Sequence, residues 1–161
     1  MRLFIDSWRW EGVPFLIRAG KQLPVTTTEV LVDLKRPPLA SLADGQANYV
    51  RFRLSPDVTI AVGARIKRPG EGMVGEHTEL SFVDQRRDDE MDAYERLLGD
   101  AMEGDATLFA RQDVVEAAWA IVEPILGTET PLHEYAPGTW GPDEANALAA
   151  PVGGWQCSTP P

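Results

Sequence analysis

The sequence predicts an α+β fold, a mainly antiparallel sheet with helices packed on it. Apolar and polar residues alternate along the first half of the chain, as they do in half-buried strands. In the second half the apolar residues recur at helical spacing. Because the strands come first and the helices follow, the sheet is expected to be antiparallel. A chain of 161 residues with 43% hydrophobic content can bury one core.

The candidate strands are short apolar runs bounded by turn-forming residues. They cover residues 13–17, 28–34, 50–54, 59–62 and 79–83. The second run ends at Lys35-Arg36-Pro37-Pro38, because two prolines remove hydrogen-bond donors from a ladder. Ser55-Pro56-Asp57 is typical of a turn, and residues 39–48 and 63–75 are expected to form loops.

Three helices are expected in the second half. Apolar offsets of three and four predict the first over residues 94–102, with Gly104 at its end. A second apolar stripe covers residues 114–126, where Pro124 should tighten the last turn. A short third helix is expected to open at Gly141-Pro142-Asp143-Glu144, with carboxylates in the first turn where the helix dipole favours them.

Charge and cysteine content limit the class of protein. Residues 1–70 carry a net charge of +5 and residues 71–161 carry −15, which gives −10 in total. A basic first half suits an anionic ligand, and an acidic second half argues against a nucleic-acid partner. No apolar run approaches the roughly 18 residues that span a bilayer, so no membrane partner is expected. The lone Cys157 cannot form an internal disulfide, which favours a reducing cytoplasm.

Several segments resemble one known family in the same order. They are the runs 8–21, 92–109, 116–126 and 135–142, together with shorter matches around 28–38 and 48–56. The run Trp8-Arg9-Trp10-Glu11-Gly12-Val13-Pro14-Phe15-Leu16-Ile17-Arg18-Ala19-Gly20-Lys21 resembles the strand and turn by which glucose-6-phosphate dehydrogenases bring a lysine to the sugar phosphate. The resemblance is to the C-terminal domain of that family and covers nearly the whole chain.

The resemblance implies an enzyme activity that this chain is not expected to have by itself. Enzymes of the family oxidise glucose 6-phosphate to 6-phosphogluconolactone in the pentose phosphate pathway and reduce NADP. We expect residues 1–161 to form a single C-terminal domain for substrate binding and dimerisation, without the N-terminal Rossmann domain that binds NADP. Neither His77 nor His133 has the context of the family's catalytic histidine, so no catalytic residue and no metal ligand are expected.

Three residues are expected at the substrate phosphate. Lys21 follows a small residue and Gly20, which let the backbone pass close to a ligand, and the resemblance implies that its ammonium meets the phosphate. Without the resemblance Lys21 would be a solvated turn residue. Where many members carry a second basic residue this chain has Thr26, and where some carry glutamine it has Ser55. Either hydroxyl could donate one hydrogen bond to the substrate. Alternatively, Thr26 and Ser55 are ordinary residues at the ends of strands.

Some relatives also hold a second, structural NADP. Arg18 and Arg53 match two of its basic contacts, but other contact positions differ, so no structural dinucleotide is expected. Arg18, Arg51 and Arg53 then belong to a solvated sheet face, to contacts with an acidic partner segment, or to an interface. The tryptophans are expected to be core or interface anchors. They are Trp8, Trp10, Trp119, Trp140 and Trp155.

The sequence is compatible with two functions. The first is the C-terminal part of a glucose-6-phosphate 1-dehydrogenase, which contributes Lys21 and a homo-oligomer interface through the sheet and is inactive alone. The alternative is a stand-alone, non-catalytic interaction protein that pairs with a full-length homologue.

Overall fold

The β-strands of this protein pair into two separate antiparallel sheets. The structure is a computed structural model that describes residues 1–36, 47–70, 72, 74–84 and 91–157. The chain divides into two compact units: residues 1–25 with 91–161, and residues 26–90. The predicted α+β class with a mainly antiparallel sheet is confirmed. The expectation of a single domain stays a prediction.

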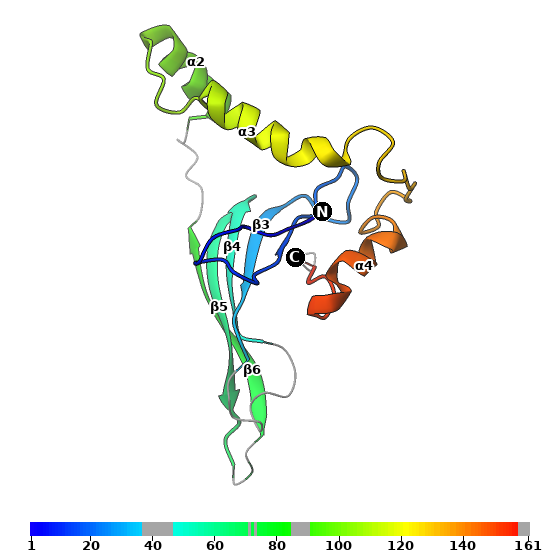
Figure 1. Cartoon of the computed structure of the whole chain (residues 1–161). Helices are drawn as coiled ribbons and strands as arrows, with labels where there is room; N and C mark the ends of the chain where they lie inside the picture. The colour runs from blue at the N-terminus through cyan, green and yellow to red at the C-terminus, as the bar shows by residue number, and fades with distance from the viewer. Residues whose placement is uncertain (37–46, 71, 73, 85–90, 158–161) are drawn as a thin grey trace. The chain divides into compact units, whose positions relative to one another are not determined.

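The unit of residues 26–90 is built on a four-stranded sheet (Figure 1). Its strands lie in chain order and each is antiparallel to its neighbour. They are β3 (Thr28–Asp33), β4 (Tyr49–Ser55), β5 (Val58–Lys67) and β6 (Gly75–Asp84). Four of the five predicted strands therefore lie in this sheet. The predicted turn at residues 55–57 connects β4 to β5. Residues 39–46 of the predicted 39–48 loop, and Pro37 and Pro38 before them, lie outside the described residues.

The two faces of this sheet differ in chemistry. The register places Val30 opposite Phe52, Phe52 opposite Ile60, and Ile60 opposite Phe82, so these side chains share one face. We call it the apolar sheet face, and it also holds Val32, Leu54, Val58, Val62 and Leu80. Its members are 38–66% exposed. Arg51 and Arg53 lie on the opposite, polar face, as the alternation predicts.

The predicted loop over residues 63–75 is wrong at its two ends, because only the segment between Lys67 and Gly75 connects the strands. Residues 63–67 continue β5, and they pair with residues 75–79 at the start of β6. Gly63 is buried within the strand, and a Cβ atom on it would lie 2.4 Å from two ring atoms of Tyr49. The glycine is therefore needed for close packing against a ring, which is why it sits inside a strand rather than in a turn.

The unit of residues 1–25 and 91–161 begins with a two-stranded ladder. β1 (Arg2–Leu3) pairs antiparallel with β2 (Phe15–Leu16), which is the core of the predicted strand 13–17. Trp10 packs edge-on against Phe15, with ring centroids 5.3 Å apart. The strand β1 has no counterpart in the sequence prediction, because two residues are too few for a periodic pattern.

The helices of this unit match the predicted ones closely. α2 (Ala93–Glu103) begins after Asp92, whose carboxylate accepts a hydrogen bond from the Tyr94 amide at 2.9 Å, and ends at Gly104 in the left-handed conformation. α3 (Gln112–Val122) is followed by the 3₁₀ turn η1 (Glu123–Ile125), so Pro124 tightens the last turn as expected.

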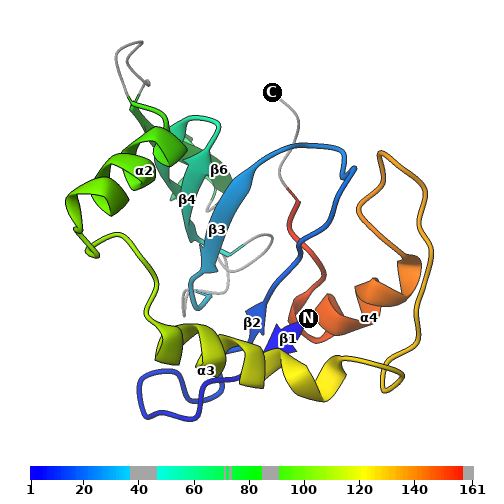
Figure 2. The ribbon, with the colours of Figure 1, turned by 90° about the horizontal axis from the view of Figure 1, so that it is seen from above.

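The predicted short third helix is also present. It consists of the 3₁₀ turn η2 (Asp143–Ala145), α4 (Asn146–Ala149) and η3 (Ala150–Val152), and a long connection joins it to α3 (Figure 2). No described helix is long and apolar enough to cross a membrane.

The apolar stripes of α2 and α3 are not covered by the described part of the chain. On α2, Leu98 is 67% exposed and Met102 is 89% exposed; on α3, Trp119 is 62% exposed. Trp8 is likewise 86% exposed. Trp8 and Trp119 are therefore not core residues here, which leaves their alternative role as interface anchors as a prediction.

Candidate functional site

Lys21 lies in a turn just after the short strand β2. Its side chain is exposed, and within the described residues its ammonium has no ion-pair partner. The next residue, Gln22, has a φ of 56° and is the one non-glycine residue recorded with a positive φ in the described chain. A side chain in this left-handed region costs about 1–2 kcal/mol, so contacts elsewhere must stabilise the turn.

Those contacts come from a segment that lies more than a hundred residues further along the chain but belongs to the same unit. The Tyr135 hydroxyl donates a hydrogen bond to the Lys21 carbonyl oxygen at 2.8 Å. The Gly138 amide donates to the Gln22 carbonyl oxygen, also at 2.8 Å. Two successive carbonyl groups of the lysine turn are therefore bonded by residues 135–138. Neither contact was part of the sequence prediction.

Gly20 lies against the same tyrosine. A Cβ atom at this position would stand 3.1 Å from the Tyr135 hydroxyl oxygen and 3.4 Å from Leu23 Cδ2. The absence of a side chain thus lets the hydroxyl reach the lysine backbone. The sequence analysis expected the backbone at Gly20 to pass close to a ligand. In the structure the group that lies close to this backbone is the Tyr135 side chain.

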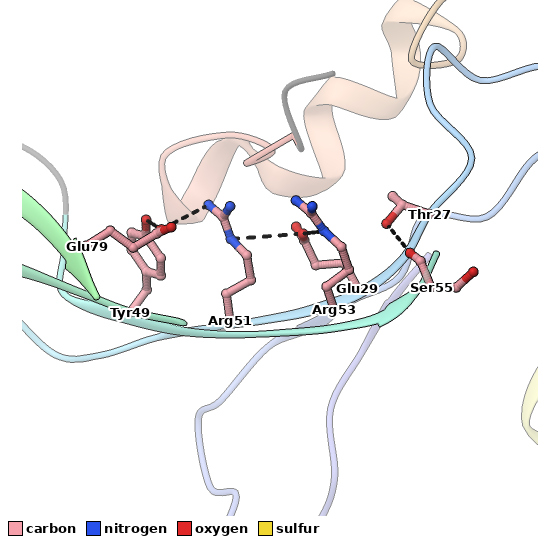
Figure 3. Close-up of polar contacts among 7 residues, drawn as sticks. All are labelled: Thr27, Glu29, Tyr49, Arg51, Arg53, Ser55 and Glu79. Atoms are coloured by element: carbon pink, nitrogen blue, oxygen red, sulfur yellow. Dashed lines mark hydrogen bonds and ion pairs between the residues drawn. The ribbon is translucent and has the colours of Figure 1, made fainter. Parts of the chain in front are cut away.

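Thr26 and Ser55 lie in the other unit, at one end of the four-stranded sheet. Ser55 is the last residue of β4 and pairs with Thr28 at the start of β3. The Thr27 hydroxyl donates to the Ser55 carbonyl oxygen at 2.8 Å, as Figure 3 shows. Thr26 is exposed and precedes this contact by one residue. The strand end thus brings the Thr26 and Ser55 segments together.

The polar sheet face carries a network of charges (Figure 3). The Glu29 carboxylate lies 3.5 Å from Arg53 Nε and 3.9 Å from Arg51 Nε. Arg51 is also 3.8 Å from the Glu79 carboxylate. The sequence interpretation left the roles of Arg51 and Arg53 open; both pair with acidic residues of the same sheet. Partly exposed pairs of this kind contribute at most about 1 kcal/mol each.

Tyr49 lies at the other end of this network. Its hydroxyl donates to the Glu79 carboxylate, its ring stacks on His77 with centroids 5.5 Å apart, and the Arg51 guanidinium lies 5.2 Å from the ring. Burial raises the pKa of the Tyr49 phenol, and the hydrogen bond to the carboxylate raises this pKa further. Tyr49 therefore remains a neutral hydrogen-bond donor at physiological pH.

Arg18 has a separate set of partners in the unit that holds Lys21. Its guanidinium lies 4.1 Å from the Trp155 ring centroid and 5.5 Å from that of Trp140. It also donates to Cys157 Sγ at 3.1 Å. Arg18 and the two tryptophans border a cavity of about 150 Å³ that Gly20 and Tyr135 also line. The two half-buried tryptophans thus belong to a local cluster around Arg18, and their role as core or interface anchors stays a prediction.

The structure also places the two histidines and the glycines at 70–75, which the sequence analysis had considered. His77 is exposed on β6, and His133 lies 3.4 Å from a Glu144 carboxylate oxygen in a connecting segment. Among the described residues, no three metal-ligating side chains come together. Gly75 leads into the strand β6 rather than a helix, so the glycines at 70–75 do not fit a Rossmann phosphate turn.

Comparison with known proteins identifies the family. The model described as "Glucose-6-phosphate dehydrogenase, C-terminal domain" matches residues 1–156. A relative from Aggregatibacter actinomycetemcomitans named glucose-6-phosphate 1-dehydrogenase is 42% identical over 159 residues, which is 95% of this chain and 32% of the relative. A relative of the same name from Zymomonas mobilis is 41% identical over 163 residues, with 92% of this chain and 34% of the relative covered.

Two solved structures are similar along essentially the whole chain. Glucose-6-phosphate 1-dehydrogenase from Mycobacterium avium has a TM-score of 0.84 and 35% identity, and the match covers 100% of this chain and 35% of that one. A glucose-6-phosphate dehydrogenase in complex with its substrate glucose 6-phosphate has a TM-score of 0.72 and 27% identity, with 98% and 34% covered.

The chain spans about a third of the length of the curated relatives it matches. The matching family model is that of the C-terminal domain, and it accounts for nearly all of the sequence. The chain therefore belongs to the glucose-6-phosphate dehydrogenase family, as its C-terminal domain.

Proposed function

We propose that this chain is the substrate-phosphate and oligomerisation domain of an NADP-dependent glucose-6-phosphate 1-dehydrogenase of the cytoplasm, and that it is inactive alone. The observation that carries the proposal is the match of the family's C-terminal model to residues 1–156. In this proposal the reaction is the oxidation of glucose 6-phosphate to 6-phosphogluconolactone in the pentose phosphate pathway. The whole chain, residues 1–161, acts as one functional domain beside an N-terminal Rossmann domain.

Lys21 is the residue proposed to bind the substrate phosphate. Its ammonium is exposed and has no ion-pair partner among the described residues, so it is available to an anion. A compact ammonium suits a phosphate group, and a charge-assisted hydrogen bond of this kind contributes about 1.5–3 kcal/mol. Thr26 and Ser55 are proposed as neutral hydroxyl donors to the substrate, since both lie at the same end of the four-stranded sheet, where Thr26 is exposed and Ser55 is half-buried.

The hydride transfer itself is assigned to residues outside this chain. The glycines at 70–75 lead into a strand and do not fit a Rossmann phosphate turn, so the proposal restricts this chain to binding and orienting the sugar phosphate. When the phosphate of the substrate is bound, the reacting carbon has fewer possible orientations. Binding a group far from the reacting carbon can in this way accelerate the reaction.

The apolar sheet face is proposed as the homo-oligomer interface. Its side chains form one continuous surface across four strands, and the most exposed of them is Phe82 at 66%. Exposed apolar surfaces of this extent mark interaction sites. On the opposite, polar face the arginines already pair with Glu29 and Glu79 of the same sheet, so that face is not proposed as the interface.

The proposal is tested with a chimeric enzyme, in which this chain replaces the matching segment of the A. actinomycetemcomitans relative. We expect glucose 6-phosphate to support NADP reduction by the chimeric enzyme. Lys21→Ala should lower kcat/KM about 10- to 150-fold, the range set by one charge-assisted hydrogen bond. Lys35→Ala removes the same charge after strand β3 and is the matched control. Equal kcat/KM values for the two variants would refute the role of Lys21.

A further inference from the structure

We infer that Tyr135 is a positioning residue for the proposed phosphate-binding lysine. The inference rests on the proposed function of Lys21 and adds a residue 114 positions further along the chain. Tyr135 does not touch the substrate in this account. It acts through the backbone of the lysine turn, to which its hydroxyl donates at 2.8 Å.

The lysine turn needs such an anchor because its own geometry is unfavourable. Gln22, immediately after the lysine, has a φ of 56° and lacks the conformational freedom of glycine. The Lys21 and Gln22 carbonyl groups each accept a hydrogen bond from residues 135–138. Loss of one of these bonds leaves the strained turn free to relax toward an ordinary conformation, and the lysine would then leave its position.

The anchoring segment is itself a preformed turn. The Thr139 amide and hydroxyl both donate to the Ala136 carbonyl, at 3.3 Å and 2.7 Å. Pro137 and Gly138 occupy the two central positions, and Gly138 has a φ of 77°. Proline followed by a glycine of positive φ is the signature of a type II turn. The segment therefore presents the Tyr135 hydroxyl and the Gly138 amide from a rigid frame.

Gly20 gives an independent way to disturb the same contact. Its φ is not in the left-handed region, so alanine is compatible with its backbone. The added Cβ would stand 3.1 Å from the Tyr135 hydroxyl oxygen and push it away from the lysine carbonyl. Gly20→Ala should therefore reproduce the effect of removing the hydroxyl, and it should have little further effect once the hydroxyl is gone.

The experiment uses steady-state kinetics of the chimeric enzyme with two sugars. Tyr135→Phe should raise KM for glucose 6-phosphate about two- to twelvefold, the range expected for one hydrogen bond, with little change in kcat. The kcat/KM for unphosphorylated glucose should stay unchanged, because that sugar has no phosphate for Lys21 to bind. Tyr94→Phe, at an exposed tyrosine of α2, is the matched control.

The Lys21→Ala background separates the inference from the proposed function. Tyr135→Phe should have no effect on KM in that background. If Lys21→Ala raises KM for glucose 6-phosphate and Tyr135→Phe does not, the inference is overturned and the proposed function stands. If Lys21→Ala has no effect, the proposed function fails and the inference fails with it. If Tyr135→Phe lowers kcat/KM equally for glucose 6-phosphate and for glucose, Tyr135 has a general structural role, and the inference is overturned.

A second measurement uses this chain without the rest of the enzyme. Amide hydrogen exchange of Gly138 reports on its bond to the Gln22 carbonyl. Tyr135→Phe and Gly20→Ala should each accelerate this exchange relative to the amides of α3, because both loosen the lysine turn. Unchanged exchange in both variants would overturn the inference even if the chimeric enzyme were inactive.

Discussion

Gly63→Ala tests the packing on the polar face of the four-stranded sheet. The new Cβ would stand 2.4 Å from two ring atoms of Tyr49, whereas carbon atoms in contact prefer about 3.5–4.0 Å. The ring must therefore move by more than an ångström. It is 6% exposed and is held by Glu79, His77 and Arg51, so the movement disturbs all three contacts.

The expected loss in the free energy of unfolding is about 2–4 kcal/mol. Overpacking of a filled site costs about 1–3 kcal/mol, and a weakened hydrogen bond to a carboxylate adds about 1.5–3 kcal/mol at most. The ordinary gain of alanine over glycine in a strand, about 0.5–1 kcal/mol, acts in the opposite direction. With a urea slope of about 2 kcal/mol per molar, the middle of the usual range for small proteins, the midpoint should fall by about 1–2 M.

Urea denaturation followed by circular dichroism measures this change. Gly99→Ala is the matched control, because Gly99 lies in α2 and a Cβ there meets nothing within 4 Å; the helix should gain about 0.5–1 kcal/mol. In a Tyr49→Ala background the ring is absent, and Gly63→Ala should lose most of its effect. A Gly63→Ala midpoint equal to that of the unaltered chain would refute the packing argument.

Two further predictions concern association and binding. Phe82→Glu should raise the dissociation constant of the self-associated chain at least about tenfold in sedimentation equilibrium, since burying a phenyl side chain contributes about 1.5–3 kcal/mol. Val83→Glu, the neighbouring residue on the polar face, should leave it unchanged, and equal effects would exclude the apolar sheet face as the interface. The chain alone should show no heat of glucose 6-phosphate binding and no NADP reduction, because one lysine supplies less than the roughly 4 kcal/mol that millimolar affinity requires. A sub-millimolar Kd from calorimetry would contradict this.

Much of the fold follows from residue periodicity. The alternation around Arg51 and Arg53 gave the strand β4 and the chemistry of its two faces, and the helical offsets gave α2 and α3 within a few residues. The failure lay in residues 63–67, where a glycine and charged residues resemble a loop. Pairing with β6 and packing against Tyr49 make this segment a strand, and neither contact is local in sequence.

The stripes on α2 and α3 illustrate a different limit. Periodicity correctly predicted that each helix has an apolar side, but it does not say what covers that side. Leu98 and Trp119 remain exposed within the described chain. Such surfaces fit a domain that packs against further parts of an enzyme or against a second copy, which is the arrangement proposed here.

The candidate site depended on the resemblance more than on pattern. Lys21 in a turn after a glycine is unremarkable by itself, and only the family likeness singled it out. The contact from Tyr135 was missed because 114 residues separate the two. Its signal was nevertheless in the sequence, since Tyr135 opens one of the ordered segments shared with the family, next to the turn-forming Pro137 and Gly138.

A crystal structure of the chimeric enzyme with bound glucose 6-phosphate tests the assignment of Lys21 most directly. The account predicts that Lys21 Nζ lies about 2.7–3.2 Å from a phosphate oxygen of the sugar. A bound sugar phosphate held by other residues, with Lys21 Nζ more than about 4 Å from every phosphate oxygen, would contradict it.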